Sequence, residues 1–224
     1  MLLHIYSNFK LGDRNQIVSL KNIALHNHSW KYKQDTQTTN KILAYCTQTE
    51  YKDGCSYQGK DHALTLDLDA SDMEYTGKKY DKASVTNNIS SITGVTCGEI
   101  YYEGTNYKKS TTPPTNPGTY TASVTIGGAT ATKNFTISKV DSTYTTPTAK
   151  TYNGTEQALV NSGQTGHGKL WYCLKDSGTW QEETVPAAKD AKKYTVLYYL
   201  EGDSTHKDVG SQSDPAGSVE VTIE

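Results

Sequence analysis

Two histidines and two cysteines in the first quarter of the chain are the residue types best suited to chemistry. His26 and His28 stand two residues apart, so on a β-strand their side chains point to the same face. Cys46 and Cys55 follow, close enough in sequence to meet across a hairpin. Together the four supply the ligand types of a tetrahedral zinc site, which is one way to stabilise a small β module. A Cys46–Cys55 disulfide and two unbonded thiols are the alternatives, and all three stay open because the spacing matches no standard zinc signature.

The other two cysteines and the clustered carboxylates give weaker signals. Cys97 and Cys173 are best interpreted as single buried small hydrophobic residues, rather than as a bridge or reactive thiols. Asp67, Asp69 and Asp72, and further on Asp203 and Asp208, could supply calcium ligands. No calcium-loop motif accompanies them, however, so solvated charged strands and turns are the simpler interpretation.

Adjacent aromatic residues suggest a binding surface. In the pairs Tyr101-Tyr102, Trp171-Tyr172 and Tyr198-Tyr199, one ring of each pair should face the core and its neighbour should face outward. Outward-facing Tyr and Trp are favoured in protein interfaces and as stacking platforms for sugars. Cross-strand packing on the outer face of a sheet is the alternative, and it is the more common reason for such rings. The candidate binding residues are Tyr102, Trp171, Trp180 and Tyr199.

Catalysis, nucleic-acid binding and membrane insertion are not expected. The sequence has no Gly-x-Ser-x-Gly, no His-Glu-x-x-His and no phosphate-binding glycine loop, so we expect no enzyme activity. The formal net charge is -2 and no Lys/Arg run is present, which disfavours nucleic acid as a partner. No stretch approaches 18 apolar residues, and residues 1–9 lack the basic region of a signal peptide.

An internal duplication organises the elements that must position these residues. Similar segments recur at an offset of about 75 residues, which indicates a tandem repeat of a small module. In the first copy they are Tyr75-Thr76-Gly77, Ile100-Tyr101-Tyr102 and 117–124, and in the second Tyr152-Asn153-Gly154, Leu170-Trp171-Tyr172 and 192–198. The sequence therefore predicts an all-β protein: a short β-hairpin module over 1–61, then small Ig-like β-sandwich modules over 62–139 and 140–224.

Within the first copy, local signals fix the expected strands. Leu64–Leu68 and Ala122–Ile126 alternate apolar and polar residues, and Gly127-Gly128 predicts a tight hairpin into the strand that follows. Gly118 permits the bend at the entry to a strand, so Tyr120 should bury its ring while its hydroxyl bonds a nearby backbone group.

These motifs resemble bacterial Ig-like repeats of the MBG type, which occur in secreted or wall-anchored proteins of Gram-positive gut bacteria. The likeness covers residues 65–224 and rests on the order of Tyr-x-Gly, the aromatic strand and Gly118-Thr119-Tyr120-Thr121. It implies an extracellular, non-catalytic stalk that spaces or presents other domains, as a monomeric array within a larger protein. The alternative function is an adhesin-like module that binds a host protein or a glycan. No cofactor is expected, apart from zinc as one of the alternatives at the N-terminal module.

Overall fold

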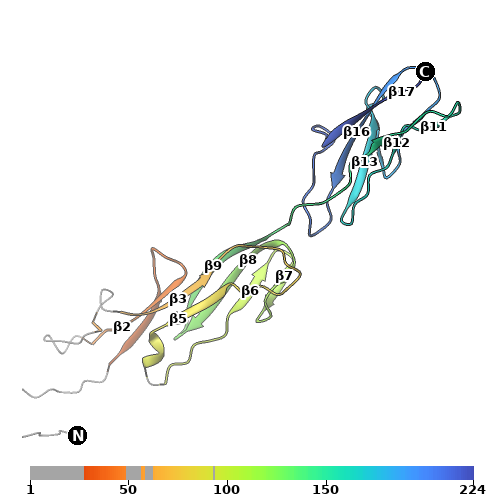
Figure 1. Ribbon diagram of the computed structural model, residues 1–224. Coiled ribbons are helices and arrows are strands. Elements are labelled where there is room, and N and C mark those ends of the chain that lie inside the picture. Colours follow the sequence, from red (N-terminus) through yellow and green to blue (C-terminus); the bar gives the residue numbers. More distant parts are fainter. Residues whose placement is uncertain (1–27, 49–56, 59–62, 93) are drawn as a thin grey trace, which may run out of the picture.

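The computed structural model describes residues 28–48, 57–58, 63–92 and 94–224 of the 224-residue chain. The protein is all-β, with 49% of the described residues in strands and 2% in helix. Its buried apolar residues fall into two separate clusters, one formed between 42 and 137 and the other between 159 and 223. Figure 1 shows the two corresponding units placed end to end, with the C-terminus at the far end of the second.

The first unit consists of two sheets that pack against each other. One has the strand order β1-β2-β3-β5 and the other β4-β9-β8-β6-β7. The strands are β1 (Trp30–Gln34), β2 (Lys41–Cys46), β3 (Leu64–Ala70), β4 (Met73–Glu74), β5 (Ala83–Asn87), β6 (Tyr101–Gly104), β7 (Tyr107–Ser110), β8 (Gly118–Ile126) and β9 (Ala129–Ser138), with a 3₁₀ turn η2 (Ile89–Ser91).

The core of the first unit follows from the two-residue period of its strands. Ile42 and Ala44 on β2 and Leu66 and Leu68 on β3 are fully buried, because alternate side chains point to the same face. From the opposite sheet Phe135 stacks on Tyr80, with ring centroids 3.9 Å apart. The β8–β9 hairpin turns at two glycines with φ of 56° and 82°, as the sequence predicts for Gly127-Gly128.

The hairpin β1–β2 belongs to this first unit. β2 pairs with β3 in the register Lys41↔Asp67, and Trp30 and Tyr32 of β1 pack against the same core. The Tyr32 ring also covers Gly127, so closely that a Cβ at Gly127 would overlap it. Residues 1–61, expected as a separate module, therefore share a sheet and a core with 62–139 wherever the structure describes them.

The second unit repeats the larger sheet of the first. Its four-stranded sheet has the order β14-β13-β16-β17, which corresponds to β7-β6-β8-β9 of the first unit. Two short sheets, β10-β12 and β11-β15, complete the unit. The strands are β10 (Thr148–Ala149), β11 (Gln157–Ala158), β12 (Val160–Asn161), β13 (Lys169–Leu174), β14 (Trp180–Glu182), β15 (Ala187–Ala188), β16 (Lys193–Glu201) and β17 (Gly217–Thr222).

Both units carry the same tyrosine anchor. Tyr120 is 7% exposed and its hydroxyl donates to the Asn116 carbonyl at 2.8 Å, as predicted for the entry to β8. Tyr194, 4% exposed at the entry to β16, donates to the Asp190 carbonyl at 2.9 Å. Each hydroxyl thus bonds the carbonyl four residues before it, which ties the loop to the strand. The second unit makes this contact without a glycine at the strand entry.

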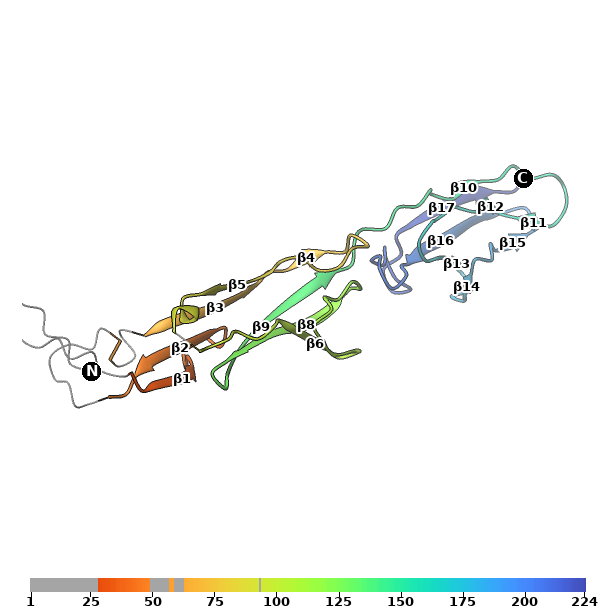
Figure 2. The same ribbon diagram turned by 90° about the horizontal axis from the view of Figure 1, so that it is seen from below.

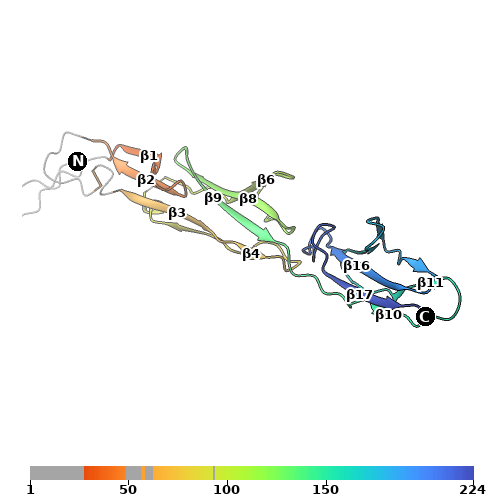
Figure 3. The ribbon, with the colours of Figure 1, turned by 90° about the horizontal axis from the view of Figure 1, so that it is seen from above.

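Four consecutive residues join the two units, and each bonds the second unit. The Lys139 ammonium donates to the Asp203 carbonyl at 2.8 Å, and the Val140 amide donates to the Thr205 carbonyl at 3.0 Å. Asp141 pairs with Lys207 at 2.8 Å, and the Ser142 hydroxyl donates to the Lys207 carbonyl at 2.5 Å. Figures 2 and 3 show the junction as a single extended segment of chain between two elongated units. The connection is short and is anchored on one side.

The described residues contain little helix. None of the helices in the described ranges has the length and hydrophobicity needed to cross a membrane.

Candidate functional site

The outer face of the large sheet in the second unit carries an aromatic cluster, which we call the aromatic face: Trp171, Trp180, Tyr199, Cys173 and Leu197. Strand register brings its members together, because Trp171 lies opposite Tyr199 and Cys173 lies opposite both Trp180 and Leu197. Directly paired and diagonal side chains on one face of a sheet are within contact distance. Residues that lie far apart in the sequence thus form one surface.

The rings contact one another closely. Trp171 and Tyr199 are stacked, with centroids 6.0 Å apart and planes 6° apart. Trp180 meets Tyr199 edge-on at 5.0 Å. The two tryptophans are half-exposed, whereas Tyr199 is only 8% exposed because they cover it. Cys173 is 1% exposed beneath them. The accessible part of the aromatic face therefore consists of the two indole rings and part of Leu197.

Charged groups border the aromatic face on one side. The Trp171 indole N–H donates to the Glu201 carboxylate at 2.8 Å. Lys169 pairs with Glu182, and this hydrogen bond raises the pKa of the Lys169 ammonium. An apolar, partly exposed platform with carboxylates and an ammonium at its edge has the composition of a sugar- or protein-contacting surface.

The corresponding face of the first unit is different. Its outward residues on β8 and β9 are Thr and Ser, with one Asn: Thr119, Thr121, Ser123, Thr125, Thr130, Thr132, Asn134 and Thr136. They bond one another across the strands, as in Thr125–Thr130 at 2.9 Å. The one large exposed aromatic ring there is Tyr101, 40% exposed, with the Lys109 ammonium 5.4 Å from its centroid.

The expectation that Tyr102 faces outward is wrong. Its ring is 6% exposed and packs edge-on against Tyr80 and Phe135 in the first core. Alternation along β6 puts Tyr101 outside instead, and the pair rule does not say which of two neighbours faces in. Of the candidate binding residues, Trp171, Trp180 and Tyr199 form one surface, and Tyr102 lies buried in the other unit.

Two of the four proposed N-terminal zinc ligands can be placed. His28 lies in a ring cluster with Trp30 at 5.0 Å and Tyr57 at 5.6 Å. Cys46 is 1% exposed and lies opposite Trp30 in the β1–β2 register. His26 and Cys55 lie outside the described residues, so the choice between zinc, a disulfide and thiols stays a prediction.

Cys97 and Cys173 lie in different units. Cys97 is half-buried against the first core, where burial raises the pKa of its thiol. Cys173 is almost fully buried, as expected for a small hydrophobic residue.

Three of the five carboxylates that could have bound calcium have structural partners among the strands and loops. Asp67 pairs with the Lys41 ammonium at 3.1 Å, and Asp72 accepts the Thr136 amide at 2.7 Å. Asp208 accepts the Gly202 amide at 2.9 Å, which closes the loop after β16. These contacts account for three of the five side chains as loop and strand supports.

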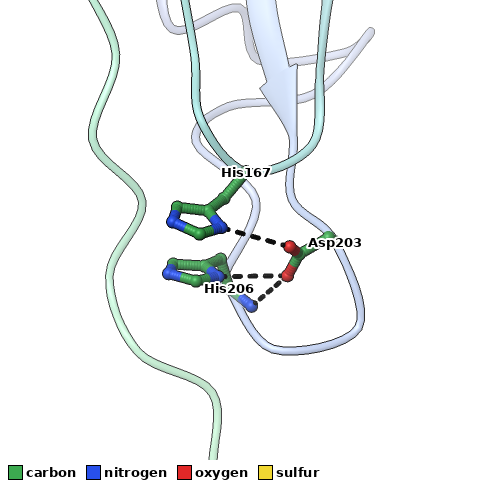
Figure 4. A group of neighbouring side chains, drawn as sticks. All are labelled: His167, Asp203 and His206. Carbon is green, nitrogen blue, oxygen red and sulfur yellow. Dashed lines mark hydrogen bonds and ion pairs between the residues drawn. The ribbon is translucent and has the colours of Figure 1, made fainter. Parts of the chain in front are cut away.

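Sequence reasoning missed a group of two histidines and one carboxylate. Among the described residues, His167, Asp203 and His206 are the one set of three His, Cys, Asp or Glu side chains whose ligand atoms lie within 4.8 Å of one another. The two imidazoles stack with centroids 3.7 Å apart, and each Nδ1 faces the Asp203 carboxylate, at 3.4 Å from His167 and 3.1 Å from His206 (Figure 4). No spacing rule could have revealed it, because two loops contribute it.

Comparison with protein families and curated proteins identifies no relative of this chain. No protein-family model matches the sequence, and no curated protein matches it significantly.

Proposed function

We propose that this chain is a non-catalytic spacer of the extracellular, surface-protein kind, which holds neighbouring domains apart. The observation that carries the proposal is the end-to-end arrangement of two separately cored β units (Figure 1). Two small cores in series extend the chain without forming a cleft between them. The sequence resemblance to MBG-type repeats supports the same function and an extracellular location.

The anchored junction supports a spacer that keeps its direction. A flexible linker lets domains swing, whereas here Lys139, Val140, Asp141 and Ser142 each bond the second unit. Holding these residues in place removes much of the freedom that a four-residue connection would otherwise have. A spacer with a restrained joint keeps a distal domain at a more constant distance.

Small-angle X-ray scattering of the whole chain tests the proposal. The expected result is a narrow distance distribution that fits the extended two-unit arrangement. A matched variant with Gly-Ser-Gly-Ser inserted between Ser138 and Lys139, before the anchored residues, should broaden that distribution. A natural chain already as broad as the insertion variant, or a compact one, would contradict the spacer.

A second candidate function is favoured by the aromatic face. A pure spacer needs no partly exposed indoles, yet the second unit presents two. In addition, β8 of the first unit has Thr and Ser where β16 has Leu197 and Tyr199. The candidate is a binding module for a host protein or a glycan. Rings at such a surface stack on sugars or act as the central contacts of an interface.

A glycan array and a serum-protein pull-down test the binding module. Binding that is lost in Trp171→Ala and Trp180→Ala, but kept in Tyr101→Ala, would assign it to the aromatic face. Tyr101→Ala is the matched control because it removes an exposed ring from the other unit. Negative results in both assays would leave only the spacer.

A further inference from the structure

The His167–Asp203–His206 group lies where the second unit holds the junction. His167 lies in the turn before β13, and Asp203 and His206 belong to the loop after β16. His206 forms a parallel bridge with Val140 of the junction. On either side of His206, the Thr205 carbonyl accepts the Val140 amide and the Lys207 amide donates to the Val140 carbonyl. Anything that fixes this loop therefore also fixes the chain that joins the two units.

The carboxylate of the group is held in place by its own loop. Asp203 accepts the Thr205 amide at 2.7 Å, the Thr205 hydroxyl at 2.8 Å and the His206 amide at 2.8 Å. These hydrogen bonds, led by the Thr205 hydroxyl, lower the pKa of Asp203 well below its usual range. The three hydrogen bonds orient the carboxylate before a metal ion arrives, which reduces the ordering cost of binding.

The two histidines supply the other ligand atoms, and their side chains differ in how far the surroundings restrict them. The His206 side chain is 13% exposed and fixed by its neighbours, whereas the His167 side chain is 49% exposed. The parallel rings cannot both direct a lone pair at one point, so His167 must turn to join the other two. In a tetrahedral zinc site, bonds of about 2.0–2.1 Å put the ligand atoms roughly 3.4 Å apart. The ligand atoms of these three side chains lie within 4.8 Å of one another, so a small movement would bring them to that spacing.

We propose that His167, Asp203 and His206 bind one divalent transition-metal ion, with zinc the best fit. Two imidazoles and one carboxylate are the ligand set of three-ligand zinc sites, in which water completes the tetrahedron. Imidazole nitrogen also disfavours Ca²⁺ and Mg²⁺, which take oxygen ligands. The Lys139 ammonium bonds the Asp203 carbonyl, and Lys207 is paired with Asp141, so the cations nearby are already engaged.

The bound ion would link the β12–β13 turn to the loop that holds Val140. It would thereby strengthen the support of the junction from the second unit. This role is independent of the spacer proposal, because zinc binding by this group can fail while the two units remain extended.

Zinc titration of the full chain by calorimetry, with cysteine thiols blocked, tests the proposal. We expect the natural chain to bind one zinc ion at this group. The zinc affinity should be at least tenfold lower in His167→Gln and in Asp203→Asn. Asn at 203 keeps an oxygen that can accept the loop amides, so loss of binding there is not loss of the turn. Asp176→Asn is the matched control, since it removes an exposed carboxylate at the other end of β13 and should leave the site unchanged.

Cobalt substitution identifies the ligands. A Co²⁺ spectrum without thiolate charge-transfer absorption, together with the losses above, would support the site. Three results would overturn it: no zinc uptake, unchanged affinity in both His167→Gln and Asp203→Asn, or an equal loss of binding in Asp176→Asn. Circular dichroism of each variant confirms that it is folded, and His167 is exposed enough to be replaced without disturbing the core.

Discussion

The two large sheets have the same strand order and the same tyrosine anchor, yet their outer faces differ. On β8 of the first unit the outward residues are Thr and Ser, whereas on the corresponding β16 they include Leu197 and Tyr199. Trp171 of β13 and Trp180 of β14 complete the aromatic face, and the first unit has the single exposed ring of Tyr101 on β6. The inward sides are alike, with apolar and Tyr side chains in both. The parts that the units share are those that a two-layered β fold needs, and the parts that differ are free to serve a partner.

The largest expected effect comes from the shared anchor. Tyr120→Ala and Tyr194→Ala should each lower the unfolding free energy of their own unit by about 3–5 kcal/mol, as truncation of a buried aromatic does. Because the cores are separate, the other unit should be unaffected. Trp30 reports the first unit and Trp171 and Trp180 the second, so tryptophan fluorescence in denaturant can follow each one. Equal loss in both units from one substitution would show that the cores are coupled.

Alkaline pH should destabilise the first unit through a buried tyrosine. Burial raises the pKa of Tyr80 in the first core to about 12. The unfolded chain ionises this phenol near pH 10, so the stability that it contributes is complete below that pH. This stability, about 2–3 kcal/mol, is lost as the pH rises from about 10 to 12. Buried Tyr172 and Tyr198 of the second unit have raised pKa values from the same cause.

The matched variant is Tyr80→Phe. It should cost about 1 kcal/mol at neutral pH, because the Tyr80 hydroxyl no longer donates to the Ser71 carbonyl. Its alkaline loss should be smaller than that of the natural chain. The unfolding free energy is measured by chemical denaturation between pH 9 and 12. If it falls with pH as steeply in Tyr80→Phe as in the natural chain, Tyr80 is not the cause of the alkaline loss.

Two adjacent glycines test whether the hairpin β1–β2 belongs to the first unit. Gly127→Ala should cost about 2 kcal/mol or more, because its φ of 56° disfavours a side chain and its Cβ would overlap the Tyr32 ring. Gly128→Ala has a similar φ but open space around its Cβ, so about 1 kcal/mol is expected. Equal losses in thermal unfolding would mean that Tyr32 does not rest on this turn.

Loss of one indole from the aromatic face has a smaller effect. Trp171→Thr removes the stacking on Tyr199 and the hydrogen bond to Glu201. We expect a loss of about 1–2 kcal/mol in the second unit, measured in urea through the remaining Trp180. A loss near zero would mean that the aromatic face contributes nothing to folding, which would strengthen the case for a binding role.

The smallest effect is expected on the Thr ladder. Thr125 is exposed and its hydroxyl bonds only Thr130 across the strands, so Thr125→Val should change stability by less than about 0.5 kcal/mol. Thermal unfolding of this variant beside Trp171→Thr gives the comparison directly. A loss as large as that of Trp171→Thr would show that the two outer faces contribute equally to folding.

The sequence predicts the strands well where alternation and turn chemistry agree. Leu64–Leu68, the Gly127-Gly128 turn and the bond of Tyr120 to the backbone all follow from local residues, because each is decided within a few positions. Pairing between distant strands is not local. The sequence therefore separates residues 1–61 from the unit that β1 and β2 complete, and it leaves His167 apart from His206, which only the folded loops bring together.

Single-molecule force unfolding of the whole chain tests the central claim most directly. Two separately cored units in series should give two events, one releasing roughly 110 residues (28–138) and one roughly 80 residues (140–223). At up to about 3.6 Å per residue these correspond to contour lengths near 40 nm and 30 nm. A single event, or a first unit that releases only the residues from 62 to 139, would contradict the account.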